Sequence, residues 1–121
     1  MSKRPVVLIV EDEIFLRIAA IDMIQRAGFT AIDATDATAA VKLLDSYLGI
    51  DVIFTDVEMP HGVNGLELAA LVKDRWPAIH IIITSGKAEI RREPRPDDSV
   101  FFDKPYDETH VIAEMRRMLG Q

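Results

Sequence analysis

The stretch that most constrains the fold of this chain is an apolar run that ends abruptly on an aspartate. The run is Val52-Ile53-Phe54-Thr55, followed by Asp56, and a proline stands four residues further on at Pro60. Because its apolar residues are continuous rather than alternating, the run predicts a strand that is buried on both faces. Asp56 would then lie at a strand's carboxyl end, where open α/β sheets bind ligands. Taken alone, the stretch fits equally well an aspartate that only caps a turn.

The remaining sequence predicts helices that alternate with short strands. Strands are expected over residues 5–10, 30–34, 52–55, 79–84 and 100–102. Helices are expected over residues 14–27, 36–48, 66–75 and 107–119, and a short or irregular fourth helix over 87–92, where glycine and proline interrupt the pattern. This alternation predicts an α/β fold of the flavodoxin-like type. We expect a three-layer sandwich with a five-stranded parallel sheet in the order 2-1-3-4-5 and helices on both faces.

Length and composition narrow the possible functions. The 121 residues suit a single domain over residues 1–121. The chain has no cysteine, which fits a reducing compartment, and we expect a cytoplasmic protein. The apolar run near the N-terminus is too short for a signal peptide or a membrane span, so no membrane contact is expected. A net charge of −6 disfavours direct binding of nucleic acid.

Polar residues gather where the predicted strands end. Glu11 and Asp12 follow the first strand, Asp56 the third, Thr84 ends the fourth, and Lys104 comes shortly after the fifth. In the order 2-1-3-4-5, strands one and three are neighbours that flank the switch point of the sheet. We therefore expect the three acids to share one hollow, with Thr84 and Lys104 on its other side.

Electrostatics indicates what such a hollow binds. Two carboxylates ~4 Å apart repel each other by about 4 kcal/mol at an effective dielectric constant of ~20, so three of them need a compensating cation. A site with a small number of ligands, all of them oxygens, suits Mg²⁺, because this ion keeps several waters and often binds a phosphate as well. A lysine beside a metal-bound carboxylate cluster suggests an incoming phosphoryl group. Each residue alone is better explained as a surface, strand or helix-end residue, and the prediction depends on their joint placement.

Together these residues resemble the response-regulator receiver domains of two-component and phosphorelay signalling. The resemblance covers the whole chain and lies in Glu11-Asp12, Asp56 with Met59-Pro60 and Gly65 after it, Thr84, and Lys104-Pro105. It implies that Asp56 accepts a phosphoryl group from a phosphohistidine on a sensor histidine kinase or a histidine phosphotransfer protein. It also implies that Asp12 binds Mg²⁺ directly, that Glu11 does so largely through water, and that the backbone carbonyl of Glu58 is a further ligand.

The resemblance also implies roles for three further residues and a peptide bond. Lys104 would contact the acceptor and then the phosphoryl oxygens, and Thr84 would donate its hydroxyl to the phosphoryl group. Phe101 would be the switch side chain that turns inward behind Thr84, and a cis peptide is expected between Lys104 and Pro105. We expect a stand-alone receiver that signals through an unknown partner protein and is not a turnover enzyme, apart from transferring the phosphoryl group to itself and losing it again.

Three departures from the family pattern matter. Asp56 to Gly65 spans one residue more than usual, which predicts a bulged, mobile loop over 61–64. The shortened fourth helix would weaken the family's common surface for homodimers. The side chain of Glu58 could reach the metal or the phosphoryl group. The same acid, two residues after Asp56, keeps open the alternative of a small haloacid-dehalogenase-like, Mg²⁺-dependent phosphohydrolase, and an unphosphorylated interaction module is a third possibility.

Overall fold

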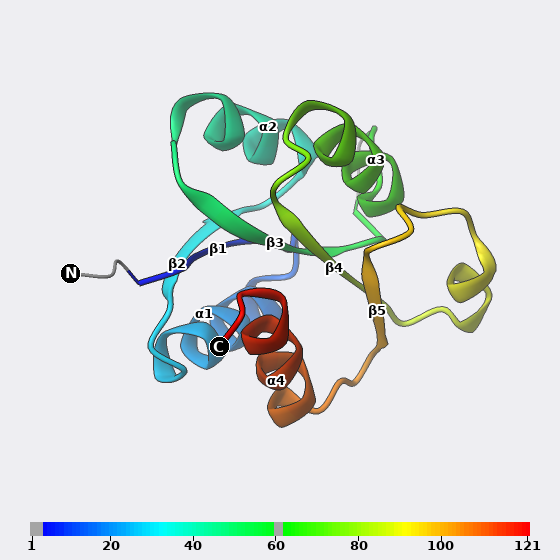
Figure 1. The fold of residues 1–121 in the computed structure, drawn as a ribbon. Coiled ribbons are helices and arrows are strands. Elements are labelled where there is room, and N and C mark those ends of the chain that lie inside the picture. Colours follow the sequence, from blue (N-terminus) through cyan, green and yellow to red (C-terminus); the bar gives the residue numbers. More distant parts are fainter. Residues whose placement is uncertain (1–3, 60–61) are drawn as a thin grey trace.

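The chain forms a five-stranded parallel sheet with helices on both faces (Figure 1). The computed structural model describes residues 4–59 and 62–121. The sheet order is β2-β1-β3-β4-β5, as the sequence predicted. Its strands are β1 (Val6–Val10), β2 (Thr30–Ala34), β3 (Ile50–Asp56), β4 (His80–Ser85) and β5 (Val100–Asp103).

Two helices cover each face of the sheet. Figure 1 shows α2 (Ala37–Ser46) and α3 (Gly65–Arg75) on one side, and α1 (Ile14–Arg26) and α4 (Glu108–Met118) on the other. Each helix begins directly after a polar side chain that accepts hydrogen bonds from amides of its first turn; these N-caps are Glu13, Asp36, Asn64 and Asp107. The caps satisfy amides that have no partner within the helix, and they therefore fix where each helix starts.

The central strand β3 is buried on both faces, as its continuous apolar run predicted. Val52 and Phe54 pack on the side of α1 and α4, whereas Ile53 packs on the side of α2 and α3. Burying such a side chain stabilises a fold by roughly 1.5–3 kcal/mol. Because both faces are packed, the end of β3 is held firmly, and Asp56 with it.

The structure corrects the predicted helices in two places. The helix expected over 36–48 ends at Ser46, and Leu48 lies in the turn before β3 with 92% of its surface exposed. In α1 the buried residues all lie in the second half of the helix, and the apolar residues of its first turns, such as Ile14 and Ile18, stay exposed. The expected short fourth helix is η1, a single 3₁₀ segment over Ala88–Arg92 that lies beyond β5 (Figure 1).

The loop after β3 and the membrane-spanning potential of the helices can be examined in the described residues. The lengthened loop over 61–64 lies partly outside the described residues, because the description stops at Met59 and resumes at Gly62. Gly62 has a φ of 96°, a backbone conformation that favours glycine. Within residues 4–59 and 62–121, no helix combines the length and the apolar character that crossing a membrane requires.

Candidate functional site

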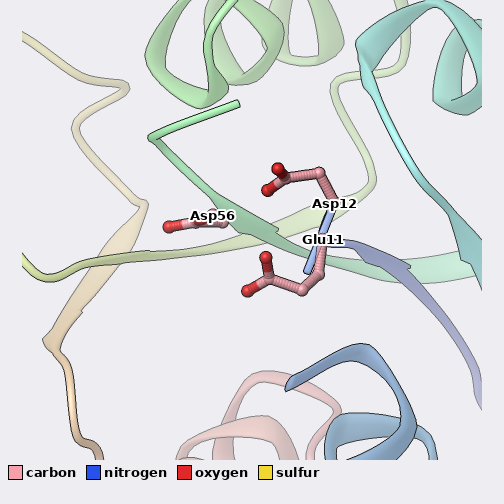
Figure 2. Close-up of side chains that lie close together, drawn as sticks. All are labelled: Glu11, Asp12 and Asp56. Carbon is pink, nitrogen blue, oxygen red and sulfur yellow. The ribbon is translucent and has the colours of Figure 1, made fainter. Parts of the chain in front are cut away.

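The three predicted acids come together at the carboxyl edge of the sheet. β1 and β3 are direct neighbours in parallel register, with Val10 opposite Thr55, so the residues that follow them emerge side by side. On the other side of β1, the amide of Glu11 continues the pairing with β2 by donating to the carbonyl of Ala34, 3.1 Å away. Figure 2 shows Glu11, Asp12 and Asp56 gathered at the ends of these two strands.

These acids form a compact, partly buried cluster. One carboxylate oxygen from each of Glu11, Asp12 and Asp56 lies within 4.8 Å of the others. Glu11 and Asp56 are buried, with 7% and 5% of their surfaces exposed, and Asp12 is exposed. Three carboxylates this close repel one another, and a set made of oxygen donors alone suits a hard cation such as Mg²⁺. The residues present therefore fit the predicted magnesium site.

Lys104 places a positive charge beside the acid cluster. Its Nζ lies 3.0 Å from Oε1 of Glu11, to which it donates a hydrogen bond, and 3.1 Å from Oδ1 of Asp56. The backbone amide of Lys104 donates to the carbonyl of Ser85 at 2.9 Å, which ties the end of β5 to the end of β4. The peptide bond between Lys104 and Pro105 is cis, as the family resemblance implied.

One lysine does not satisfy both buried acids. The contact of Asp56 Oδ1 with Lys104 is an ion pair without hydrogen-bond geometry, and this buried oxygen has no hydrogen-bond partner among the described residues. Burial raises the pKa of Asp56 to about 6, and the charge of Glu11 adds to this, while Lys104 opposes it. Burial lowers the pKa of Lys104, but the hydrogen bond to Glu11 and the charges of both acids outweigh it and raise that pKa above its usual range. The site therefore contains a buried carboxylate, that of Asp56, with one oxygen that accepts no hydrogen bond from the described residues.

Thr84 and Phe101 occupy the predicted positions on the neighbouring strands. Thr84 is buried and lies opposite Asp56 in the ladder between β3 and β4. Phe101 points into the core on the side of α2 and α3, with 7% of its surface exposed. Arg91 and Arg95 place their guanidinium groups 4.8 Å and 5.5 Å from the centre of its ring. The ring is inward in this structure, and its role as a switch stays a prediction.

The side chain of Glu58 does not join the acid cluster. It turns to the end of β4, where both carboxylate oxygens lie 2.8 Å from the hydroxyl of Ser85 and Oε1 also accepts the amide of Gly86 at 3.1 Å. The carboxylate, which from its position in the sequence could reach the metal or the phosphoryl group, is instead bound to Ser85 and Gly86. The hydroxyl residue that follows Thr84 was the feature of the sequence that pointed to this contact.

Gly65 explains how α3 approaches the acceptor so closely. A Cβ atom at this position would lie 2.0 Å from the backbone oxygen of Asp56, and the Gly65 amide donates to the carbonyl of Val57 at 3.0 Å. Any side chain here would push the first turn of α3 away from the end of β3. The glycine is therefore required by close packing rather than by an unusual φ.

Sequence reasoning missed an exposed apolar surface beside the site. Ile14, Phe15, Leu16 and Ile18 of α1 are 52%, 76%, 45% and 54% exposed, and we call these four residues the α1 patch. Leu16 also lines a pocket of about 390 Å³ together with Lys104 and Tyr106. Burial, aided by the charge of Glu108, raises the pKa of Tyr106 to about 12, so its phenol stays neutral. The apolar residues of the first helical turns, at positions 14–16 and 18, were the available indication.

Comparison with known proteins agrees with this geometry. The family model described as the response regulator receiver domain matches residues 7–116. The sensory transduction protein RegX3 of Mycobacterium bovis is 32% identical over 93% of this chain and 50% of its own length. The sensor kinase CckA of Brucella abortus is 28% identical over 98% of this chain and 13% of its own length. The chain thus spans half or less of the length of these two relatives.

Solved structures support the same fold. The response regulator receiver protein from Sinorhizobium medicae superimposes with a TM-score of 0.88 at 24% identity, over 98% of this chain and 96% of that one. Receiver domains are signalling modules of phosphorelays rather than classical turnover enzymes. Because the family model matches residues 7–116, the chain belongs to the response regulator receiver domain family.

Proposed function

We propose that this chain, a single receiver domain over residues 1–121, transmits a signal by accepting a phosphoryl group on Asp56. The observation that carries the proposal is the state of that side chain. Its Oδ1 is buried, lacks a hydrogen-bond partner among the described residues, and faces a lysine and two further acids. A buried acceptor atom left without a partner costs free energy, which a bound cation and phosphoryl group would recover.

The proposed reaction is an in-line transfer from a phosphohistidine. The O–P bond forms as an Asp56 oxygen attacks phosphorus, and the P–N bond breaks with its electron pair staying on the ring nitrogen. The histidine ring, protonated on its other nitrogen, leaves as neutral imidazole. Lys104 offsets the charge on the phosphoryl oxygens, and the hydroxyl of Thr84, directly across the ladder, donates to one of them.

Receiver domains bind Mg²⁺ at an acidic pocket, and we propose the same for this chain. Glu11, Asp12, Asp56 and the backbone carbonyl of Glu58 would hold the ion. When bound, Mg²⁺ neutralises charge on the carboxylates and on the transferring phosphoryl group. The haloacid-dehalogenase-like alternative depended on Glu58 as a second acid near the acceptor, and neither the family match nor the contacts of Glu58 with Ser85 and Gly86 support it.

We further propose that the phosphodonor is a histidine kinase or phosphotransfer protein, the class of partner with which receiver domains interact. The α1 patch supports this, because large apolar residues that stay exposed near a reactive group are typical of protein contacts. Leu16 of this patch and Lys104 line the same pocket of about 390 Å³. A downstream partner protein would then read the phosphorylated state.

Intact mass spectrometry tests the acceptor. Wild-type protein and Asp56→Asn are incubated with acetyl phosphate, a small phosphodonor, with and without Mg²⁺. We expect one added phosphoryl group on the wild type in Mg²⁺ only. An adduct of equal yield on Asp56→Asn would refute the assignment, and absence of an adduct on both proteins would do so if a phosphorylated histidine protein also fails to donate.

Substitutions in the α1 patch test the protein donor. Phe15→Ser and Ile18→Ser should slow phosphorylation by a phosphohistidine protein at least about tenfold, the loss expected for removal of about 1.4 kcal/mol of contact energy. Phosphorylation by acetyl phosphate should be unchanged. Leu48→Ser is the matched control, since Leu48 is equally apolar, is 92% exposed, and precedes the opposite end of β3. Equal rates for all four proteins would exclude the patch as a docking surface.

A further inference from the structure

The carboxylate of Glu58 is an anion bound by the protein's own donors beside the acceptor. Its two oxygens lie 2.8 Å from the Ser85 hydroxyl, and Oε1 lies 3.1 Å from the amide nitrogen of Gly86. A hydroxyl and a backbone amide that converge on one anion resemble the donors that hold phosphoryl oxygens in other proteins. This small anion site is filled by a side chain that the sequence places two residues after Asp56.

The contact is connected by backbone hydrogen bonds to the ends of three strands, β3, β4 and β5. Ser85 follows Thr84 directly, and its own carbonyl accepts the amide of Lys104 at 2.9 Å. One residue before Glu58, the amide of Val57 donates to the carbonyl of Thr84, also at 2.9 Å. A shift of Glu58 is therefore transmitted to the ends of β4 and β5, where the threonine and the lysine stand.

Glu58 lies in the wall of an open hollow that it shares with another acid, Asp12. Glu58 is half-buried and lines a hollow of about 490 Å³ that also includes Asp12, Asn64 and Lys87. Phosphorylation adds roughly −1.5 to −2 charge units to Asp56. The negative charge of Glu58, two residues along the chain from Asp56, disfavours the added charge, and both anions would draw on donors at the end of β4.

We propose that Glu58 is a positioning residue that acts as a displaceable internal anion: it occupies the Ser85 and Gly86 donors while Asp56 is unmodified, and it is expelled when Asp56 carries a phosphoryl group. This inference rests on the proposed function. Displacement frees the end of β4 to move toward the phosphoryl group, and it makes the phosphorylated arrangement costlier than it would be with a neutral residue at position 58.

Beryllofluoride, an inorganic mimic of a phosphoryl group on a carboxylate, tests the inference in saturating Mg²⁺. Its affinity is measured by amide NMR titration of the wild type, Glu58→Gln and Glu58→Ala. The oxygen of a glutamine can accept both hydrogen bonds that Oε1 accepts now, so Glu58→Gln removes the charge but not the geometry. We expect Kd to fall roughly threefold to tenfold in Glu58→Gln, and further in Glu58→Ala.

Glu89→Gln is the matched control, because it removes one negative charge from the neighbouring η1 segment, where Glu89 is exposed. Its Kd should stay within about twofold of wild type. In the wild type, the Gly86 amide resonance should move on saturation toward its position in unliganded Glu58→Ala. A Gly86 resonance that does not move, or a Glu58→Gln variant that binds no tighter, overturns the inference. Failure of the wild type to bind beryllofluoride would instead refute the proposed function.

Discussion

Replacing Asp56 by asparagine should stabilise the metal-free protein, and the gain should grow with pH. Burial and the neighbouring Glu11 raise the pKa of Asp56 from 3.8 to about 6. In that interval the folded chain binds more protons than the unfolded chain, so the free energy of unfolding falls as pH rises. Above the folded pKa the loss is complete, and a shift of about two units corresponds to about 3 kcal/mol. Asparagine imitates the protonated acid and avoids this loss.

The expected gap between Asp56→Asn and wild type is about 1.5 kcal/mol at pH 5 and about 3 kcal/mol at pH 8. Urea unfolding in EDTA at several pH values measures it by linear extrapolation. Saturating Mg²⁺ should then stabilise the wild type and narrow the gap, since the ion binds the folded carboxylates.

Asp74→Asn is the control for removal of a carboxylate. Asp74 is an exposed residue of α3 with no ion pair to another described residue, so its substitution should change stability by no more than about 0.5 kcal/mol. A gap for Asp56→Asn that stays constant from pH 5 to pH 8, or a variant less stable than wild type in EDTA, would refute the electrostatic reasoning.

Three further substitutions test the packing around the site. Gly65→Ala should destabilise the fold by about 2 kcal/mol or more, because its Cβ would lie 2.0 Å from the backbone oxygen of Asp56; thermal unfolding measures this, and an unchanged Tm would contradict it. Lys104→Met should leave two buried acids facing each other, which should lower the stability by about 1–3 kcal/mol at pH 7 and slow phosphorylation by acetyl phosphate at least about tenfold. If neither the stability nor the phosphorylation rate falls, the ion pair has neither role. Arg91→Ala should lose its contact with the Phe101 ring and cost about 1 kcal/mol, whereas Arg91→Lys should recover part of it; equal stability of all three proteins in urea would count against the contact.

Much of the fold could be predicted because its determinants are local in the sequence. The apolar run that ends at Asp56 is buried on both faces, as its continuity indicated, and the strand predicted at residues 30–34 has those bounds in the structure. The helices predicted to start at Asp36 and Asp107 begin one residue later, because each of these aspartates is the N-cap. Helix ends were harder to predict: α2 stops at Ser46 rather than Leu48, because the backbone is already extended at Tyr47.

The joint position of the acids could also be predicted, because parallel strands bring their carboxyl ends to one edge. Glu11, Asp12 and Asp56 needed only the sheet order to be placed together, and the structure has them within 4.8 Å of one another. Their further partners could not be assigned in the same way. The direction of the Glu58 side chain depends on its rotamer and on a hydroxyl 27 residues away.

The sequence thus predicted the element order, the buried central strand and the edge of the sheet at which the acids, Thr84 and Lys104 meet. Periodicity, caps and chain breakers act within a few residues and can be recognised without coordinates. Only tertiary packing set three other features: among the described residues Asp56 Oδ1 has no hydrogen bond, Glu58 binds Ser85 and Gly86, and the α1 patch is exposed. Those outcomes depend on rotamers and on packing between residues far apart in the chain, where several arrangements satisfy the same local pattern.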